Sequence, residues 1–158
     1  MTKTTYNYQG TFDPTRMARA FTTNQIASWK YGLEIGRTIK GKYVHDAEKF
    51  LQDVIDQKQP LRLRTYHKKI PHRPGQAVLG TKSGRYPQKT CKSWLNLLNT
   101  VRANADVKGL DVKKLQIVHA IATMGFSRIR NQAQGRISGK SRKSKSAHME
   151  IIVREVGA

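Results

Sequence analysis

Apolar residues recur at helical spacing in three parts of the chain. In the first, residues 28–40, they follow one another four residues apart, at Tyr31, Ile35 and Ile39. Gly32 and Gly36 lie beside this stripe and would allow another element to pack closely against it. Ser28 is a suitable N-cap. The pattern predicts a helix over residues 28–40.

Two further helices are predicted on the same grounds. In residues 44–57 one face consists of apolar side chains, namely Val44, Ala47, Leu51, Val54 and Ile55. In residues 87–107 the apolar face consists of Cys91, Trp94, Leu95, Leu98, Val101 and Ala105. Pro87 suits the first turn of this helix, and Gly109 follows its end. Cys91 is therefore interpreted as a small core residue rather than a reactive thiol.

Two later segments alternate apolar and polar residues, which is typical of strands. One face of the first is predicted to hold Leu115, Ile117, His119 and Ile121. In the second, near the end of the chain, Met149, Ile151 and Val153 oppose His148, Glu150, Ile152 and Arg154. We predict that the two strands pair antiparallel. Their connection, residues 125–145, is too long for an ordinary hairpin loop and is predicted to be an extended finger.

The net charge of the chain indicates what kind of partner it binds. The 158 residues include 30 Lys and Arg against 10 Asp and Glu, a formal net charge of +20. Such an excess of one sign calls for a polyanion nearby. The length favours one domain, residues 1–158, with residues 1–17 as an N-terminal extension. The lone cysteine fits an intracellular protein. The longest relevant uncharged stretch, residues 115–127, is too short for a membrane span, so no membrane insertion is expected.

The positive charge is concentrated where acidic residues are absent. Residues 57–105 and 112–149 contain no carboxylate and hold 11 and 9 Lys or Arg respectively. Phosphate is the natural counter-charge for side chains without local partners. In residues 57–87 the cations alternate with Tyr and His, which suits RNA because aromatic rings stack on bases. Prolines and glycines there predict an irregular loop that orders on RNA, although a mobile surface loop with incidental charge stays an alternative.

The finger has a similar composition. Phe126, Ile129 and Ile137 are spaced among seven cations: Arg128, Arg130, Arg136, Lys140, Arg142, Lys143 and Lys145. An isolated two-stranded arm is marginally stable in water, so a partner is expected to hold it.

Six short segments, in this order, resemble one known family. They are IKG (39–41), AEKFLQDVI (47–55), GRYP (84–87), RANADVKGLDV (102–112), LQIVHA (115–120) and HMEIIV (148–153). From residue 18 to residue 156 the chain resembles the universal large-subunit ribosomal protein twenty-two family, in its archaeal and eukaryotic branch (protein seventeen in the eukaryotic naming).

The resemblance implies an α+β fold, with three helices packed on a small three-stranded sheet and a long protruding β-hairpin. It adds a first strand around residues 20–26. It also implies a structural constituent of the cytoplasmic ribosome without enzymatic activity or cofactor. The hairpin would line the nascent-peptide exit tunnel, and the body would lie near the tunnel exit. The expected partners are large-subunit rRNA, neighbouring ribosomal proteins and the nascent polypeptide.

Two groups of site residues follow from the charge pattern and the resemblance. The rRNA contacts are expected at Lys40, Lys42, Arg62, Arg64, Tyr66, His67, Lys68, Lys69, Arg73, Lys82, Arg85, Tyr86 and Lys89. The tunnel hairpin is expected to use Arg128, Arg130, Gln132, Gln134, Arg136, Lys140, Arg142 and Lys143. Family members commonly carry an arginine and an aromatic residue before the Gly-Arg pair of the tip. Here Gln132, Ala133 and Gln134 stand in that place, so the tip contacts should differ.

Two other functions fit parts of the pattern. Asp53 and Asp56, three residues apart on a predicted helix, would hold a divalent metal in a nucleic-acid enzyme. However, the five histidines are too scattered to complete a site, and the two carboxylates also fit a solvated helix face. A packaging protein that coats any polyanion would have the same charge. Only the ordered set of motifs argues against it.

Overall fold

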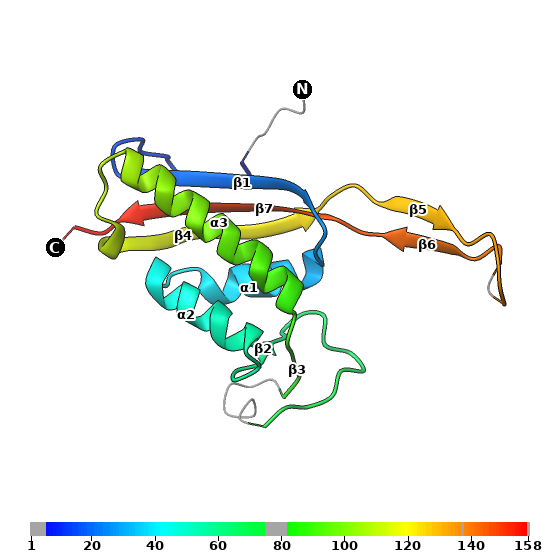
Figure 1. Cartoon of the computed structure of the whole chain (residues 1–158). Coiled ribbons are helices and arrows are strands. Elements are labelled where there is room, and N and C mark those ends of the chain that lie inside the picture. Colours follow the sequence, from blue (N-terminus) through cyan, green and yellow to red (C-terminus); the bar gives the residue numbers. More distant parts are fainter. Residues whose placement is uncertain (1–5, 75–81, 137, 158) are drawn as a thin grey trace.

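The computed structural model describes residues 6–74, 82–136 and 138–157. Figure 1 shows its elements along the chain. In order they are β1 (Met17–Gln25), α1 (Trp29–Ile39), α2 (Val44–Ile55), β2 (Leu61–Arg62), β3 (Gly84–Arg85), α3 (Gln88–Val107), the 3-10 helix η2 (Val112–Lys114), β4 (Leu115–Met124), β5 (Arg128–Asn131), β6 (Ser141–Ser144) and β7 (Ala147–Glu155). The α+β fold with three helices, a small sheet and a hairpin is confirmed.

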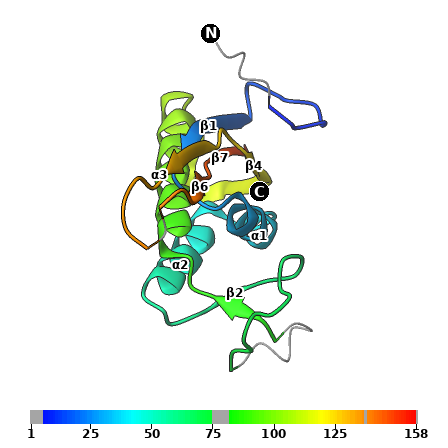
Figure 2. The same ribbon diagram turned by 90° about the vertical axis from the view of Figure 1, so that its right-hand side faces the viewer.

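The main sheet has three antiparallel strands in the order β1-β7-β4. β7 lies in the centre, where Ile151 pairs with Ala20 on one side and with Ala120 on the other. The predicted pairing of the last two strands is therefore confirmed, and β1 overlaps the strand expected around residues 20–26. The three helices cover one face of this sheet, as the two ribbon views together make clear (Figures 1 and 2).

The predicted alternation along β4 is wrong beyond its third residue. Ile117 pairs with Val153 but His119 pairs with Ile152, so Val118 forms a bulge that turns the following side chains over. Leu115, Ile117, Ala120 and Ala122 form the helix-facing set, while His119 and Ile121 leave it.

The close approach of α1 to β4 explains why β4 carries small residues, Ala120 and Ala122, where it faces this helix. A Cβ atom at Gly36 would lie 2.6 Å from the Ala120 carbonyl oxygen, and one at Gly32 would lie 2.7 Å from the Ala122 Cβ. No room is left between this helix and the strand for an isoleucine at either position. The close packing expected at the two glycines is confirmed.

The core lies between the helices and the sheet and contains most of the predicted apolar faces. Trp94, Ile35, Leu51 and Leu98 are fully buried in it. The buried faces of α2 and α3 also include Phe50 and Leu97, which were not predicted. Leu95 of α3, which was predicted to be apolar core, is only partly buried. Cys91 is fully buried, and desolvation raises the pKa of its thiol to about 12. Its interpretation as a core residue is confirmed.

The second face of the sheet is covered by residues 6–12 of the N-terminal segment. Glu150, only 1% exposed, accepts hydrogen bonds from the backbone N–H of Asn7 at 3.0 and 3.1 Å, and its Oε1 lies 2.7 Å from His119 Nε2. The Arg19 guanidinium lies 4.8 Å from the ring centroids of both Tyr6 and Phe12. The N-terminal extension expected at residues 1–17 is thus part of the folded body from residue 6 onwards; residues 1–5 lie outside the described part.

The contact between α1 and β4 predicts a stability effect. In a Gly36→Ala variant the new Cβ would meet backbone, which cannot move aside as a flexible side chain can. This clash should outweigh the roughly 1 kcal/mol that alanine gains in helix propensity, for a net loss of about 1 to 2 kcal/mol in the free energy of unfolding. Gly157→Ala is the matched control, because nothing lies within 4 Å of its added Cβ. Urea unfolding of both variants checks this, and equal midpoints would contradict it.

Burial of Cys91 predicts a thiol that reacts only after unfolding. At pH 8 the folded protein should label with an aromatic disulfide reagent far more slowly than the protein in urea, because both the raised pKa and the packing suppress thiolate attack. Absorbance of the released thiol measures the two rates. Rapid labelling without denaturant would show that the first turns of α3 open readily.

Candidate nucleic-acid interface

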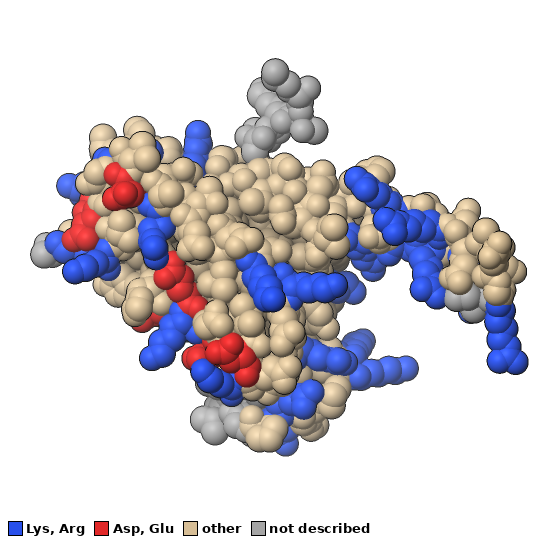
Figure 3. All heavy atoms as spheres, viewed as in Figure 1, with Lys and Arg blue, Asp and Glu red and all other residues tan. Residues whose placement is uncertain are grey.

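The finger carries charge of one sign only, whereas acidic and basic side chains are mixed on the body. Figure 3 shows the acidic side chains gathered on the body away from the finger, while the finger carries basic side chains. Outside the two buried carboxylates, the acidic residues belong mostly to α2, the end of α3 and the C-terminal end of β7: Asp46, Glu48, Asp53, Asp56, Asp106, Asp111 and Glu155. A polyanion is thus attracted to one end of the body.

The basic loop, residues 57–87, begins and ends on the core. Leu61 and Leu63 are fully buried, and β2 pairs with β3 through Leu61 with Arg85 and Arg62 with Gly84. A bridge between His72 and Ser83 extends this ladder. The predicted loop is therefore less irregular than expected at its two ends. Residues 75–81, which include Gly75 and Gly80, lie outside the described part of the chain.

A buried carboxylate of α1 positions the first half of this loop. Glu34 is 1% exposed, and its Oε1 accepts a hydrogen bond of 2.8 Å from the Thr65 backbone N–H. Arg37 lies 4.0 Å from the same oxygen and donates to the Thr65 hydroxyl. The bond leaves Arg64 exposed and sets Tyr66 against Trp29, with 5.4 Å between the ring centroids. Sequence patterns did not reveal this role, because Glu34 reads as an ordinary solvated helix residue.

The predicted rRNA-binding residues divide into two unequal groups. Most lie on the loop and the start of α3, with these side chains exposed: Arg64, His67, Lys68, Lys69, Lys82, Arg85 and Lys89. Arg62, Tyr66, Arg73 and Tyr86 are half-buried, and the Arg73 guanidinium lies 5.5 Å from the Tyr86 ring centroid. Lys40 and Lys42 follow the other end of α1, with the Lys42 ammonium 4.9 Å from the Phe50 ring centroid. The fold does not bring these two lysines together with the loop.

Beyond the sheet the chain continues from β4 into β5 and returns through β6 to β7, which forms the predicted finger (Figure 1). Every residue of β5 and β6 is exposed. Arg130 pairs directly with Arg142 across the two strands, and like charges in opposite positions destabilise a ladder. Gln132, Gln134, Arg136 and Lys140 lie exposed at the tip, and Ile137 is outside the described residues. A counter-charge is needed to relieve the repulsion along this arm.

The root of the finger is fixed by the end of β1. Asn24, which has a positive φ of 48°, accepts a hydrogen bond of 3.1 Å at Oδ1 from the Phe126 N–H. The Ser146 hydroxyl donates to the Phe126 carbonyl oxygen at 2.6 Å, and the Gly125 N–H donates to the Ser146 carbonyl oxygen at 2.9 Å. These bonds set the direction in which the finger leaves the body.

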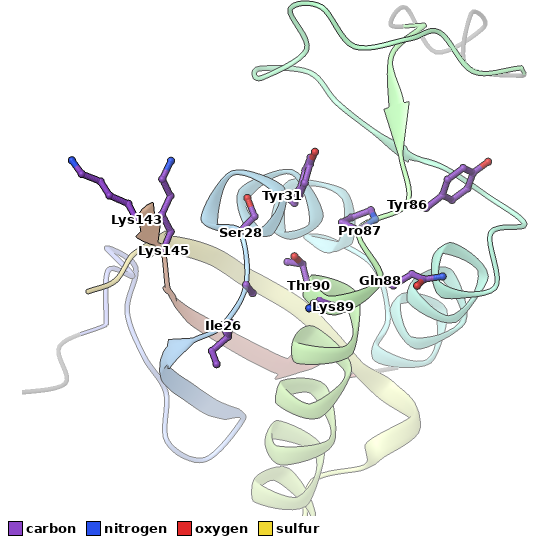
Figure 4. Close-up of a pocket in the computed structure, with 11 residues that line it drawn as sticks. Ile26, Ser28, Tyr31, Tyr86, Pro87, Gln88, Lys89, Thr90, Lys143 and Lys145 are labelled. Atoms are coloured by element: carbon purple, nitrogen blue, oxygen red, sulfur yellow. The ribbon is translucent and has the colours of Figure 1, made fainter. Parts of the chain in front are cut away.

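A groove lies where the finger root, α1 and α3 meet (Figure 4). It brings together Tyr86 and Lys89, which were expected to bind rRNA, and Lys143, which was expected on the tunnel hairpin. Sequence reasoning placed them in two separate segments. The other lining residues, among them Ser28 and Thr90, were not among the predicted site residues.

The alternative of a metal-dependent enzyme finds no assembled site in the described part of the chain. Among residues 6–74, 82–136 and 138–157, no three His, Cys, Asp or Glu side chains are placed to hold a metal ion. Asp56 instead accepts a hydrogen bond of 2.9 Å from Gln52 Nε2 and pairs with Lys58 at 3.2 Å. Within the same residues, no helix combines the length and apolar character that a membrane span requires.

Comparison with known proteins agrees with this architecture. A family profile described as ribosomal protein L22p/L17e matches residues 20–154. The Large ribosomal subunit protein uL22 of Thermofilum pendens is 38% identical, covering 96% of this chain and 98% of its own. Its counterpart in Methanocaldococcus jannaschii is 37% identical over 94% of both chains. That of Staphylothermus marinus is 40% identical over 91% of this chain and 92% of its own. The match spans helices, sheet and finger alike, and the chain belongs to the ribosomal protein L22p/L17e family.

Proposed function

We propose that this chain is a structural constituent of the large ribosomal subunit that binds and organises its rRNA. The observation that carries the proposal is the finger, an exposed two-stranded arm in which Arg130 faces Arg142. Such an arm gains stability from a polyanion that lies along both strands. Relatives of nearly the same length are named as large-subunit proteins, which supports the ribosome as the source of that polyanion.

The proposed mechanism is binding without chemistry. Lys and Arg side chains of the loop and the finger replace counterions along rRNA phosphates, so the affinity depends strongly on salt. Because the two basic elements leave the body in different directions (Figure 1), one protein can hold two rRNA segments that would otherwise repel each other. Tyr66 and Tyr86 add faces for bases or riboses. The other exposed loop residues supply positive charge around them.

The finger tip is proposed to line the nascent-peptide exit tunnel, with the body near the tunnel exit and against neighbouring ribosomal proteins. Gln132, Gln134 and Arg136 are exposed at the tip. Short polar and basic side chains allow a polypeptide of any sequence to pass, because they offer no apolar patch to which it would adhere. A general packaging protein for polyanions remains the competing function, and it would not distinguish rRNA from duplex DNA.

Finger truncation should weaken incorporation into the subunit. We replace residues 128–144 by a short turn and retain the root bonds at Asn24, Phe126 and Ser146, so that the body stays folded. Sedimentation with the large subunit at moderately high salt should give stoichiometric retention of the full chain and reduced retention of the truncated one. Loss of both at modest salt would point instead to a peripheral polyanion binder.

Neutralising the facing arginines should lower the salt dependence of rRNA binding. For an Arg130→Gln/Arg142→Gln variant we expect the slope of log affinity against log salt to fall by about 1 to 2 units, since two phosphate contacts are lost. The matched control is Lys49→Gln/Lys113→Gln, which removes two exposed lysines outside the loop and finger. Filter binding to a large-subunit rRNA transcript measures both slopes. Equal slopes for the two variants would count against finger–RNA contact.

A further inference from the structure

An open groove lies between the finger and the body, and its lining includes three lysines. Its volume is about 510 Å³, and the residues that line it are Ile26, Ala27, Ser28, Tyr31, Tyr86, Pro87, Gln88, Lys89, Thr90, Lys143 and Lys145. Figure 4 shows the first turns of α1 and α3 next to each other, with Lys143 and Lys145 extending side by side from the finger strand. No carboxylate belongs to this lining.

Two helix N-termini open into the same groove. α1, of 11 residues, follows Ser28, and α3, of 20 residues, follows Pro87. Neither helix has a side-chain cap: the Ser28 hydroxyl makes no capping hydrogen bond, and proline has no side-chain acceptor to offer. The first-turn N–H groups of a helix lack intrahelical acceptors, and the helix dipole adds positive potential there. Both ends therefore favour a negatively charged occupant.

Thr90 adds a hydrogen-bond donor to the groove, independently of the helix N-termini. It is 3% exposed and lines the groove, and Figure 4 shows it on the side of α3 that is turned toward α1. Its hydroxyl makes no hydrogen bond among the described residues, and it is not one of their fully buried unpaired atoms, so it reaches the open groove. An anion in the groove would accept from this hydroxyl and from the first-turn N–H groups that follow Gln88, whose own N–H donates to the Tyr86 carbonyl oxygen at 2.9 Å.

The lysines determine which anion is suitable. Lys89 comes from the body, whereas Lys143 and Lys145 come from the returning side of the finger. With no carboxylate in the lining, an external negative charge is the natural counter-ion for these lysines. Tyr31 and Tyr86 line the same groove and offer rings to a ribose or base next to a phosphate.

We propose that this groove binds one phosphodiester of an RNA backbone, and that the bound phosphate ties the finger to the body. The inference rests on the proposed rRNA-binding function and goes further, by naming Thr90, Lys89, Lys143, Lys145 and the first turns of α1 and α3 as one phosphate site. Residues from both the finger and the body contact the same ligand. RNA binding at this site therefore restricts the angle between them.

The test uses Thr90→Val, which removes the hydroxyl and keeps the shape and charge of the side chain. We expect about tenfold weaker binding to a large-subunit rRNA transcript with an unchanged salt slope, because a hydrogen bond to a charged phosphate is lost without loss of a cation. Thr90→Ser should restore the affinity. For Lys89→Gln and Lys143→Gln we expect slopes reduced by about one unit each. Lys49→Gln, on α2, is the matched control and should leave both quantities unchanged.

A second measurement keeps the result separate from any effect on folding. Amide chemical shifts of Lys30, Lys89 and Thr90 are followed while inorganic phosphate is added to the full-length protein, with thermal melting of each variant as a check. Saturable shifts at both helix N-termini that are weaker in Thr90→Val support the site. If Thr90→Val and the two groove lysine variants bind the transcript as the Lys49 control does, the phosphate site is wrong while rRNA binding stands. If the wild-type chain binds duplex DNA as tightly as the transcript, the proposed function itself fails.

Discussion

The antiparallel ladder between β4 and β7 is the interaction on which the rest of the molecule depends. It places β7 in the centre of the sheet and gives the helices a surface on which to pack. The same two chain segments continue past the sheet to become the finger, so the direction of the finger follows from the register of the ladder. Asn24 and Ser146 fix the point at which it leaves the body.

Two buried carboxylates hold other segments of the chain against the helices and the sheet. Glu34 holds the start of the basic loop through the Thr65 N–H, and Glu150 holds the N-terminal segment through the Asn7 N–H. Both are 1% exposed, and a buried carboxylate is costly unless it is hydrogen-bonded. Each one thus ties a segment outside the sheet to the body through a backbone N–H. In a chain with 10 acidic residues, using two of them internally also increases the positive charge at the surface.

The body differs from the loop and finger in how its charged side chains are paired. The body has an apolar core, and several of its acidic residues pair with basic ones, as with Glu48 and Arg102 at 3.2 Å. The finger has no carboxylate of its own, and the loop has none beyond Asp56, which pairs with Lys58 at its start. Ordering the two elements costs about 1 to 2 kcal/mol per residue in backbone entropy. In the proposed function, binding of rRNA would supply this free energy. Conformation and affinity at these two elements are thus coupled.

The sequence by itself determined the three helices, the pairing of the last two strands, the basic loop and finger, and the family. Apolar periodicity, charge runs and motifs are local properties, so they can be read without knowing the fold. Tertiary structure alone decided the bulge at Val118, the burial of Glu34 and Glu150, and the groove at Thr90. Each of these depends on which distant segments meet. The closeness of α1 to β4 excludes large side chains, and the convergence of two helix starts with the finger creates a site that no single segment contains.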